Sequence, residues 1–306
     1  MKHLLIINGA KREIKALQIA EILKHFEGLD PVIHYTTAPH EATTFLREYL
    51  TENKDEVTVY ACGGDGTINE VVNGLIGFPQ AIMAIFPIGT GNDFVKVYGG
   101  VAAYENPDDV IHGEIHKVDV SVLKGAEEGE IASINVINFG FDAVVGERGA
   151  IYASQGKKNP FDRAIPEAIL KARRNKIEVY ADGEKLNEKV MLLSCLAHGK
   201  YVGGKFCCAP KSDNEDGLMD VSVAHCMSLF SFMGLMKTYE VGKHLDDPKT
   251  AKRFSYRRAK EVRIVCKKRS AICVDGEMVH GTDMTATVIP GAIRLLCPKK
   301  KEPAAE

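Results

Sequence analysis

The first third of the chain alternates short apolar runs with amphipathic stretches. A buried strand is predicted at residues 4–7, and further strands at residues 31–35, 57–62 and 81–87. Between them, apolar side chains recur at helical spacing in three sets: Ile19, Ile22, Leu23 and Phe26; Ala42, Phe45, Leu46, Tyr49 and Leu50; and Ile68, Val71, Val72, Leu75 and Ile76. Pro39 is expected to open the second of these helices. Strands that alternate with amphipathic helices predict βαβ units and a mostly parallel sheet.

From about Lys117 the pattern changes to short runs in which apolar and polar residues alternate. These runs cover residues 118–125, 131–139, 177–186, 190–197, 218–224, 262–268 and 271–279, and Asp-Gly or Gly-rich turns often join them. Such a pattern is typical of an antiparallel sandwich or barrel. A helical segment at residues 160–176 interrupts it, and the charged residues 299–306 are expected to form a disordered tail.

Composition and charge narrow the classes of protein. A length of 306 residues is enough for two domains, and the formal net charge of -2 argues against a dedicated nucleic-acid binder. No run approaches the roughly 20 apolar residues of a spanning helix, and the N-terminal apolar run is too short for a signal peptide, so a cytoplasmic protein is expected. The 8 cysteines form no CxxC pair and favour reduced thiols. His198 and His280 lack the partner spacing of a zinc site.

Candidate chemistry begins between the third strand and the third helix, at Gly63, Gly64, Asp65 and Gly66. Thr67 followed by Glu70 fits a capping box at the helix start. In a parallel sheet such a loop lies at the carboxyl edge, where ligands bind. Glycines there, with the N–H groups of a helix N-terminus, suit a phosphate group, although a tight turn that needs glycine only for its dihedral angles explains the loop equally well. Neither a GxxxxGK[ST] loop nor a complete GxGxxG is present, because Asn69 stands at the third glycine position.

A carboxylate in a phosphate-binding loop suggests a cation between them. Mg²⁺ typically binds through one or two carboxylates and the phosphates of a substrate, which is a role that Asp65 fits. A second strand-end loop, residues 86–94, repeats the arrangement with glycines, Thr90, Asn92 and Asp93. Two such loops on one sheet edge predict a site for a magnesium-bound nucleotide.

These loops resemble those of the diacylglycerol kinase catalytic family, specifically its bacterial soluble lipid kinases. The matching stretches are GGDGTINEVVNGL at residues 63–75 and PIGTGNDF at residues 87–94. The resemblance continues in family order over nearly the whole chain. Further matches are FGFDA at residues 139–143, a Gly-Gly…Pro…Asp-Gly-Leu-Asp pattern (Gly203, Gly204, Pro210, Asp216, Gly217, Leu218, Asp220), and Asp275-Gly276-Glu277.

The resemblance implies an α/β plus all-β architecture with an ATP site in the cleft between two domains. The N-terminal domain would be a Rossmann-like α/β domain of the NAD-kinase and phosphofructokinase type, formed by residues 1–116 with 284–298. Its last strands, split by Pro290-Gly291, would return to it from a C-terminal antiparallel β-sandwich at residues 117–283 that binds the lipid.

The resemblance also implies roles for individual residues. Carried over by position, the ATP contacts would be Asn8, Thr36, Gly63, Gly64, Asp65, Gly66, Thr67, Asn69, Thr90, Asn92 and Asp93. Asp65 and Asp93 would hold or water-bridge the catalytic Mg²⁺, and Glu277 would be the general base. A second, structural Mg²⁺ would take the Asp216 side chain and the Asp213 and Leu218 carbonyls as ligands.

Some features separate this chain from relatives that share GGDGT. The downstream motifs of phosphofructokinases and NAD kinases have no counterpart here, and sphingosine kinases usually have SGNAL where Asp93 and Phe94 stand. Two positions depart from the family pattern. The first loop of the family reads NPxxG, whereas this chain has NGAKR at residues 8–12, which leaves open whether residues 8–11 contact ATP. At the second position, His198-Gly199 stands where the family has Asn-Gly.

Each of these functional interpretations has a plainer structural alternative. Glu277 follows an Asp-Gly turn and could be simply exposed, and the loop around Asp216 could be a solvated acidic turn. Asp182-Gly183-Glu184 repeats the same three letters in a polar turn and is interpreted as structural only. Basic residues at 171–176 and 252–268 and the apolar segment 228–236 are candidates for membrane contact, but each also fits a solvated face or a core helix.

The sequence therefore predicts a lipid kinase that depends on ATP and Mg²⁺ and phosphorylates the hydroxyl of diacylglycerol or a related lipid. Phosphatidic acid or the corresponding lipid phosphate would be the product. Transient contact with the inner face of the membrane is expected, no nucleic-acid partner is expected, and a homodimer is left open. The alternatives are a kinase of a soluble polyol or cofactor on the same fold, and a non-catalytic regulator that binds nucleotide or lipid.

Overall fold

The chain divides into two compact units. The structure, a computed structural model, describes residues 2–9, 13, 15–188 and 190–299. One unit contains the residues up to Val118 and those from Pro290 onward, and the other contains Asp119–Ile289. The predicted domain boundaries lie a few residues away, and the assignment of one domain to nucleotide and the other to lipid stays a prediction. Most of the predicted tail, residues 300–306, lies outside the described residues.

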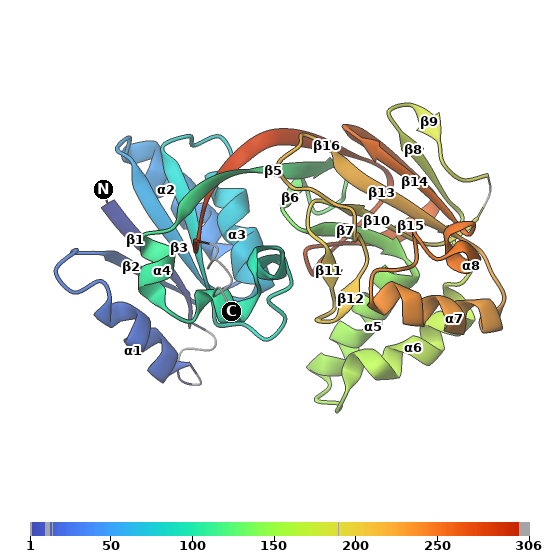
Figure 1. Ribbon diagram of the computed structural model, residues 1–306, viewed down its shortest axis with the longest axis horizontal. Coiled ribbons are helices and arrows are strands. Elements are labelled where there is room, and N and C mark those ends of the chain that lie inside the picture. Colours follow the sequence, from blue (N-terminus) through green and yellow to red (C-terminus); the bar gives the residue numbers. More distant parts are fainter. Residues whose placement is uncertain (1, 10–12, 14, 189, 300–306) are drawn as a thin grey trace, which may run out of the picture. The chain divides into compact units, whose positions relative to one another are not determined.

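The first unit is built on a parallel sheet. Its strands and main helices are β1 (Lys2–Asn8), α1 (Ala16–Lys24), β2 (Val32–Thr36), α2 (Glu41–Glu52), β3 (Val57–Gly63), α3 (Asp65–Leu75) and β4 (Ala81–Pro87). The strand order is β2-β1-β3-β4, all parallel. The short elements η2 (Phe94–Tyr98), η3 (Val101–Tyr104) and α4 (Pro107–Ile111) follow β4. The βαβ units predicted from the hydrophobic pattern are confirmed (Figure 1).

Burial explains why these strands form. Every residue of β3 and β4 is buried, as expected for parallel strands covered on both faces.

The expected role of Pro39 is wrong, because α2 begins at Glu41 and is preceded by His40 in a left-handed conformation (φ 64). The proline therefore lies before the helix and not in its first turn.

The second unit is a mostly antiparallel sheet structure with helices. Its elements are β5 (Glu114–Lys124, which begins in the first unit), β6 (Ile131–Ser133), β7 (Val136–Gly140), α5 (Phe141–Ser154), α6 (Pro160–Lys171), β8 (Ile177–Ala181), β9 (Glu184–Lys185), β10 (Met191–Ala197), β11 (Tyr201–Val202), β12 (Phe206–Cys207), β13 (Met219–His225), α7 (Leu229–Glu240), α8 (Pro248–Ala251), β14 (Phe254–Ala259), β15 (Glu261–Val274) and β16 (Glu277–Cys297). The strands run in the order β14-β13-β10-β7-β15-β16, and β8 pairs with β15. The predicted β-sandwich class is confirmed.

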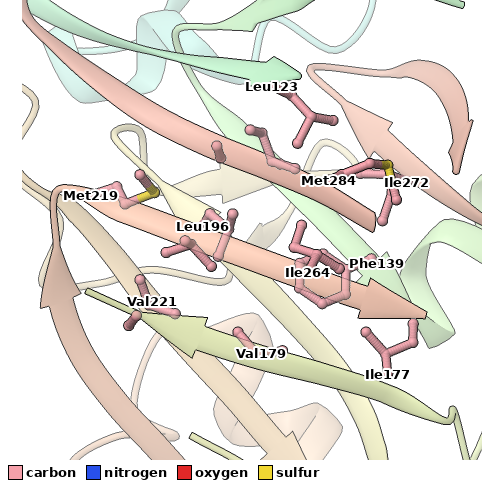
Figure 2. Close-up of a cluster of buried hydrophobic side chains, with 14 of the residues drawn as sticks. Leu123, Phe139, Ile177, Val179, Leu196, Met219, Val221, Ile264, Ile272 and Met284 are labelled. Carbon is pink, nitrogen blue, oxygen red and sulfur yellow. The ribbon is translucent and has the colours of Figure 1, made fainter. Parts of the chain in front are cut away.

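A large apolar core holds this unit together. Figure 2 shows part of it: Leu123, Phe139, Ile177, Val179, Leu196, Met219, Val221, Ile264, Ile272 and Met284, which come from β5, β7, β8, β10, β13, β15 and β16. Each buried aliphatic or aromatic side chain of this kind contributes about 1.5–3 kcal/mol. The alternating strand pattern thus places one side of each strand in this core.

Three features of the second unit differ from the prediction. Helix α5 was not predicted, and α6 ends at Lys171, five residues before the predicted end at Lys176. Strand β16 runs unbroken through Pro290 and Gly291. These two residues lie between the ladder that β16 forms with β15, which reaches Thr287, and the ladder with β4, which starts at Arg294. Strand β5 also pairs with β16, so this strand has three partners along its length.

Candidate active site

The first glycine-rich loop is tighter than the sequence indicated. Gly63 is the last residue of β3, Gly64 is the N-cap, and α3 already begins at Asp65. The predicted capping box is wrong, since Glu70 Oε2 accepts a hydrogen bond from the Ala42 backbone N–H at 3.2 Å and so ties α3 to α2. The hydroxyl of Thr67 accepts a hydrogen bond from Asn8 Nδ2 at 3.2 Å instead, which joins the end of β1 to the first turn of α3.

The glycines of the two loops are required by close approach. A Cβ atom on Gly63 would lie 2.1 Å from Thr67 Oγ1, and one on Gly89 would lie 2.3 Å from the Cα of Gly64. The Gly89 N–H donates to the Gly63 carbonyl at 3.1 Å. The structure therefore brings the two predicted loops into backbone contact, as expected for the carboxyl ends of neighbouring parallel strands.

Asp65 links the two loops through its carboxylate. Its Oδ1 accepts hydrogen bonds from the backbone N–H groups of Asp93 at 2.8 Å and Phe94 at 3.5 Å. Its Oδ2 faces Gly91, where a Cβ atom would be 2.6 Å away. The carboxylate thus fixes the second loop against the start of α3, and only glycine at position 91 leaves room for it.

Asn92 stabilises the second loop from inside. It adopts a left-handed conformation (φ 50), which asparagine tolerates better than most residues. Its side-chain amide donates to the carbonyls of Pro87 at 3.2 Å and Gly89 at 3.0 Å. Asn92 Oδ1 is buried and has no hydrogen-bond partner within the part of the chain that the structure describes. A buried acceptor of this kind is available to a donor group of a ligand.

The metal prediction rests on Asp65 and Asp93. Asp93 is buried, and its carboxylate contacts the Lys96 ammonium at 2.6 Å. No cluster of three or more His, Cys, Asp or Glu side chains that could hold a metal ion exists among residues 2–9, 13, 15–188 and 190–299. Two hard carboxylates fit Mg²⁺ when phosphates and water complete its coordination. The donor set is therefore compatible with a metal that arrives with a nucleotide.

The remaining predicted nucleotide contacts do not all lie at the strand ends and loops that carry Asp65 and Asp93. Thr36, the last residue of β2, pairs with Asn8, and a Cβ atom on Gly9 would lie 2.2 Å from the Thr36 carbonyl oxygen. Thr90 is exposed in the second loop. Asn69 instead lies one turn inside α3, buried, where its Oδ1 accepts from Asn73 Nδ2 at 3.1 Å. Residues 10–12 of the departing first loop lie outside the described residues.

In the second unit, the hairpin between β15 and β16 carries Glu277. Glu277 is the first residue of β16 and is partly exposed. Within the described parts of the chain its carboxylate forms no hydrogen bond or ion pair. The turn is formed by Asp275 and Gly276, both with positive φ (50 and 100), as a type I′ hairpin requires. A carboxylate that no neighbouring side chain engages remains available to accept a proton.

Asp275, for which no role beyond its motif was predicted, fixes this hairpin. Its buried carboxylate accepts hydrogen bonds from the Ser133 hydroxyl at 2.7 Å and from the backbone N–H groups of residues 134–136 at 2.9, 3.1 and 2.8 Å. The Asp-Gly turn signal was visible in the sequence. The partner segment was not, because it lies about 140 residues earlier in the chain.

The acidic loop predicted to hold a second Mg²⁺ is paired with an arginine. Asp216 forms an ion pair with Arg258, and its Oδ1 accepts from the Leu218 backbone N–H at 2.9 Å. Asp213 Oδ1 accepts from the Glu215 N–H at 3.0 Å. A cation at Asp216 would compete with the guanidinium group. The arrangement therefore does not by itself favour a second metal, and this site stays a prediction.

Two other motif residues have shifted pKa values. His198, which replaces an expected asparagine, is buried and contacts the Ser121 hydroxyl at 2.8 Å, and burial lowers its pKa to about 4. In the FGFDA motif, loss of solvation raises the pKa of the partly exposed Asp142 to about 6, and Tyr239 donates to its carboxylate at 3.4 Å. Both residues lie within the second unit.

Comparisons with known proteins match this architecture. The model of the diacylglycerol kinase catalytic domain matches residues 2–123, and that of the YegS C-terminal NAD kinase beta sandwich-like domain matches residues 135–297. A diacylglycerol kinase of Bacillus subtilis is 27% identical over 271 residues, which cover 87% of this chain and 86% of that protein. A probable lipid kinase YegS-like of Chromohalobacter salexigens is 25% identical over 313 residues, covering 96% and 93%.

Among solved structures, a diacylglycerol kinase from Bacillus anthracis has a TM-score of 0.68 at 20% identity and covers 97% of this chain and 96% of its own. At that identity the likeness supports the fold.

The chain belongs to the diacylglycerol kinase catalytic family, in its bacterial YegS-like branch. Membership supports a kinase, and specifically a lipid kinase that uses a nucleotide. No helix in the described part of the chain is long and apolar enough to cross a membrane.

Proposed function

We propose that the protein is an ATP- and Mg²⁺-dependent lipid kinase that transfers the γ-phosphoryl group of ATP to the hydroxyl of diacylglycerol or a closely related lipid. With diacylglycerol the product would be phosphatidic acid. The observation that carries the proposal is the pair of strand-end loops joined by the Asp65 carboxylate, in a chain whose two halves match the two family models. A relative named diacylglycerol kinase supports the choice of lipid.

In this proposal the first unit binds the nucleotide. The backbone N–H groups at the start of α3 attract phosphate, because they are unpaired within the helix and lie at its positive end. Gly63, Gly64 and Gly66 allow the phosphates to approach the backbone. Asp65 and Asp93 would hold Mg²⁺, and the bound ion would neutralise charge on the phosphates. The buried Asn92 Oδ1 is suited to accept a hydrogen bond from a water molecule or a nucleotide hydroxyl.

Asn8, Thr36, Thr67, Asn69 and Thr90 complete the proposed nucleotide contacts. Asn8 donates a hydrogen bond to the Thr67 hydroxyl, which joins the end of β1 to the first turn of α3. The Asn69 side chain accepts a hydrogen bond from Asn73, one turn further along α3, and so supports the helix that follows the first loop. Asn8 is included among the proposed nucleotide contacts, and residues 10 and 11 are not, because they lie outside the described residues.

Glu277 is the proposed general base in the second unit. It accepts the proton of the lipid hydroxyl as the oxygen attacks the γ-phosphorus, which requires a carboxylate that is not already neutralised by a neighbouring cation. The absence of an ion pair at Glu277 among the described residues suits that role. Asp275 positions the hairpin that carries it.

The proposal is tested by transfer of labelled γ-phosphate from ATP to a panel of lipids in mixed micelles. Diacylglycerol, monoacylglycerol, ceramide, sphingosine and undecaprenol would be compared, with a soluble polyol as a further acceptor. We expect label in diacylglycerol above all others. Label only in the polyol would replace the lipid with a soluble substrate. Binding of Mg-ATP without any label transfer would indicate a non-catalytic regulator.

A further inference from the structure

Three segments that the sequence singled out separately lie together in the second unit. The sulfhydryl of Cys226, just before α7, contacts the Arg173 carbonyl after α6 at 3.2 Å. The Lys267 backbone N–H donates to the Lys176 carbonyl at 3.1 Å. The basic segment 171–176 therefore contacts both the chain just before α7 and the basic end of the 252–268 segment, and side chains of α6 and α7 belong to one buried core.

Helices α6 and α7 each expose large apolar side chains. Phe230 is 88% exposed, Leu170 is 84% exposed and Met233 is 60% exposed. The opposite face of α7 is buried in the core of the unit through Phe232, Leu235 and Tyr239. Helix α7 thus has an inner apolar face that the fold uses and an outer apolar face that the fold leaves in solvent. Exposed apolar groups that gather on one helix face commonly mark an interaction site.

The neighbouring charge is positive and is not neutralised by the fold. Arg174 and Lys176 are exposed, and within the described residues neither forms an ion pair. The four arginines on β14 and β15 differ, because each is paired with a carboxylate: Arg257 with Glu184, Arg258 with Asp216, Arg263 with Asp283 and Arg269 with Glu127. Arg174 and Lys176 therefore contribute unpaired positive charge beside the chain that leads into α7.

The backbone under these cations is fixed. Asn175, between Arg174 and Lys176, donates through Nδ2 to the Ala172 carbonyl at 2.6 Å and the Leu192 carbonyl at 2.7 Å. Its own N–H donates to the Met191 carbonyl at 2.9 Å. The segment is thereby tied to β10, and its cations are presented without a loop having to become ordered on binding.

We propose that Leu170, Arg174, Lys176, Phe230 and Met233 form a docking surface for an anionic lipid bilayer. Exposed Phe and Leu next to Lys and Arg on a helical surface is the pattern of helices that lie in the membrane interface, where apolar groups insert and cations meet anionic headgroups. The choice of a bilayer rests on the proposed lipid kinase function.

A second copy of this chain fits the surface less well than a bilayer does. An isologous dimer places the same patch on both subunits, and the unpaired cations beside α7 would then approach their own copies. The docking surface therefore favours a negatively charged partner with an apolar interior.

The test is co-sedimentation with vesicles in the absence of ATP. Vesicles of phosphatidylcholine with phosphatidylglycerol, and of phosphatidylcholine alone, would be titrated with wild type, Phe230→Ser/Met233→Ser and Arg174→Gln/Lys176→Gln. We expect the apolar variant to lose about tenfold or more in partition coefficient. The cation variant should lose about 30-fold on anionic vesicles, and high salt should abolish that difference.

Matched controls come from the same chain. Leu17, on α1 of the first unit, is also 88% exposed, so Leu17→Ser removes an equally exposed apolar side chain. Lys243→Gln/Lys249→Gln removes two exposed cations beyond the other end of α7. Both controls should bind vesicles as wild type does. All the substituted side chains are exposed or partly so, and circular dichroism checks that each variant is folded.

Three outcomes would overturn the docking surface. Wild type could fail to bind anionic vesicles, or the surface variants could bind as well as the controls. Sedimentation velocity could instead show a wild-type dimer that the surface variants lose, which would assign the surface to a second copy. Phosphorylation of a short-chain diacylglycerol below its aggregation concentration separates this failure from failure of the proposed function. The surface variants should phosphorylate that dissolved lipid at the wild-type rate.

Discussion

Replacement of Asp275 tests whether one buried carboxylate holds the hairpin that carries Glu277. Asp275 is only 8% exposed, so water cannot replace its hydrogen bonds. Its donors include three backbone N–H groups, of residues 134–136, at 2.8–3.1 Å, and the Ser133 hydroxyl. Removal of the carboxylate would leave these donors buried and unpaired.

The magnitude follows from those hydrogen bonds. An unsatisfied buried donor costs about 1–3 kcal/mol, so three N–H groups at the lower half of that range cost about 4 kcal/mol in Asp275→Ala. Alanine also adds about 1 kcal/mol because position 275 has a positive φ. Asp275→Asn keeps one acceptor oxygen and tolerates the left-handed conformation, and should lose about half as much, roughly 2 kcal/mol.

The assay is urea unfolding followed by circular dichroism, with Asp182→Ala as the matched control. Asp182 begins the other Asp-Gly-Glu turn, has a similar φ of 47, and accepts from the backbone N–H groups of Lys260 and Glu261 at 3.0 Å. It is exposed, so water can replace its carboxylate and the loss should be about 1 kcal/mol. Equal losses at positions 182 and 275 would refute the argument from burial. In kinase assays Asp275→Asn should lower kcat while the KM for ATP stays near the wild-type value.

The remaining predictions concern the base, a buried histidine and the second metal. Glu277→Gln should abolish turnover and leave Mg-ATP binding intact by calorimetry; full activity would remove Glu277 from the mechanism. His198 is held neutral by a pKa of about 4, below its unfolded value near 6.5, so the unfolded chain gains a proton first as pH falls. His198 should therefore cost about 2 kcal/mol of stability between pH 7 and pH 5, and urea unfolding of His198→Gln should show a correspondingly smaller pH dependence; an equal dependence in both proteins would contradict this assignment. A structural Mg²⁺ at Asp216 predicts that Mg²⁺ raises the Tm of wild type but not of Asp216→Asn, and equal Tm shifts would eliminate that site.

The elements that the sequence predicted well are those in which a local pattern decides the structure. Strand β4 was predicted with its observed bounds, Ala81–Pro87, because a fully buried apolar run is flanked by Gln80 and by the glycines of the second loop. The approach of the two loops was also predictable. Parallel strands that are neighbours end at the same edge, and the repeated glycines with Asp65 and Asp93 identified both ends.

The features that the sequence missed depend on partners distant in the chain. Thr67 and Glu70 have the spacing of a capping box, but a hydrogen bond to Ala42 of α2 engages Glu70. The Asp-Gly turn at Asp275 was visible, and its apolar flanks separated it from the polar turn at Asp182, but no local signal showed what the Asp275 carboxylate binds. Only the tertiary fold brings residues 133–136 to Asp275. The same holds for residues 171–176 and α7, which the fold joins across more than 50 residues.

Strand β16 and helix α5 show two further limits of local pattern. Pro290 and Gly291 predicted a break, but β16 continues through them: its partner changes from β15 to β4, and β5 pairs with it as well. Helix α5 packs with α6 and on the strands behind it, and its apolar residues are spread around the helix and not confined to one stripe. Periodicity therefore gave no signal for it.

The central claim is that the paired loops at Asp65 hold the metal-bound nucleotide whose phosphate is transferred to a lipid. The most direct measurement is the rate of labelled γ-phosphate transfer to diacylglycerol by wild type and by Asp65→Asn under identical Mg-ATP and micelle conditions. Asparagine keeps an oxygen that can accept from the Asp93 N–H, so the loops should stay together and the unfolding midpoint should stay close to that of wild type. We expect robust transfer by wild type and a loss of at least about 1,000-fold in Asp65→Asn, equivalent to roughly 4 kcal/mol of transition-state stabilisation. A folded Asp65→Asn that transfers phosphate within tenfold of wild type would contradict it.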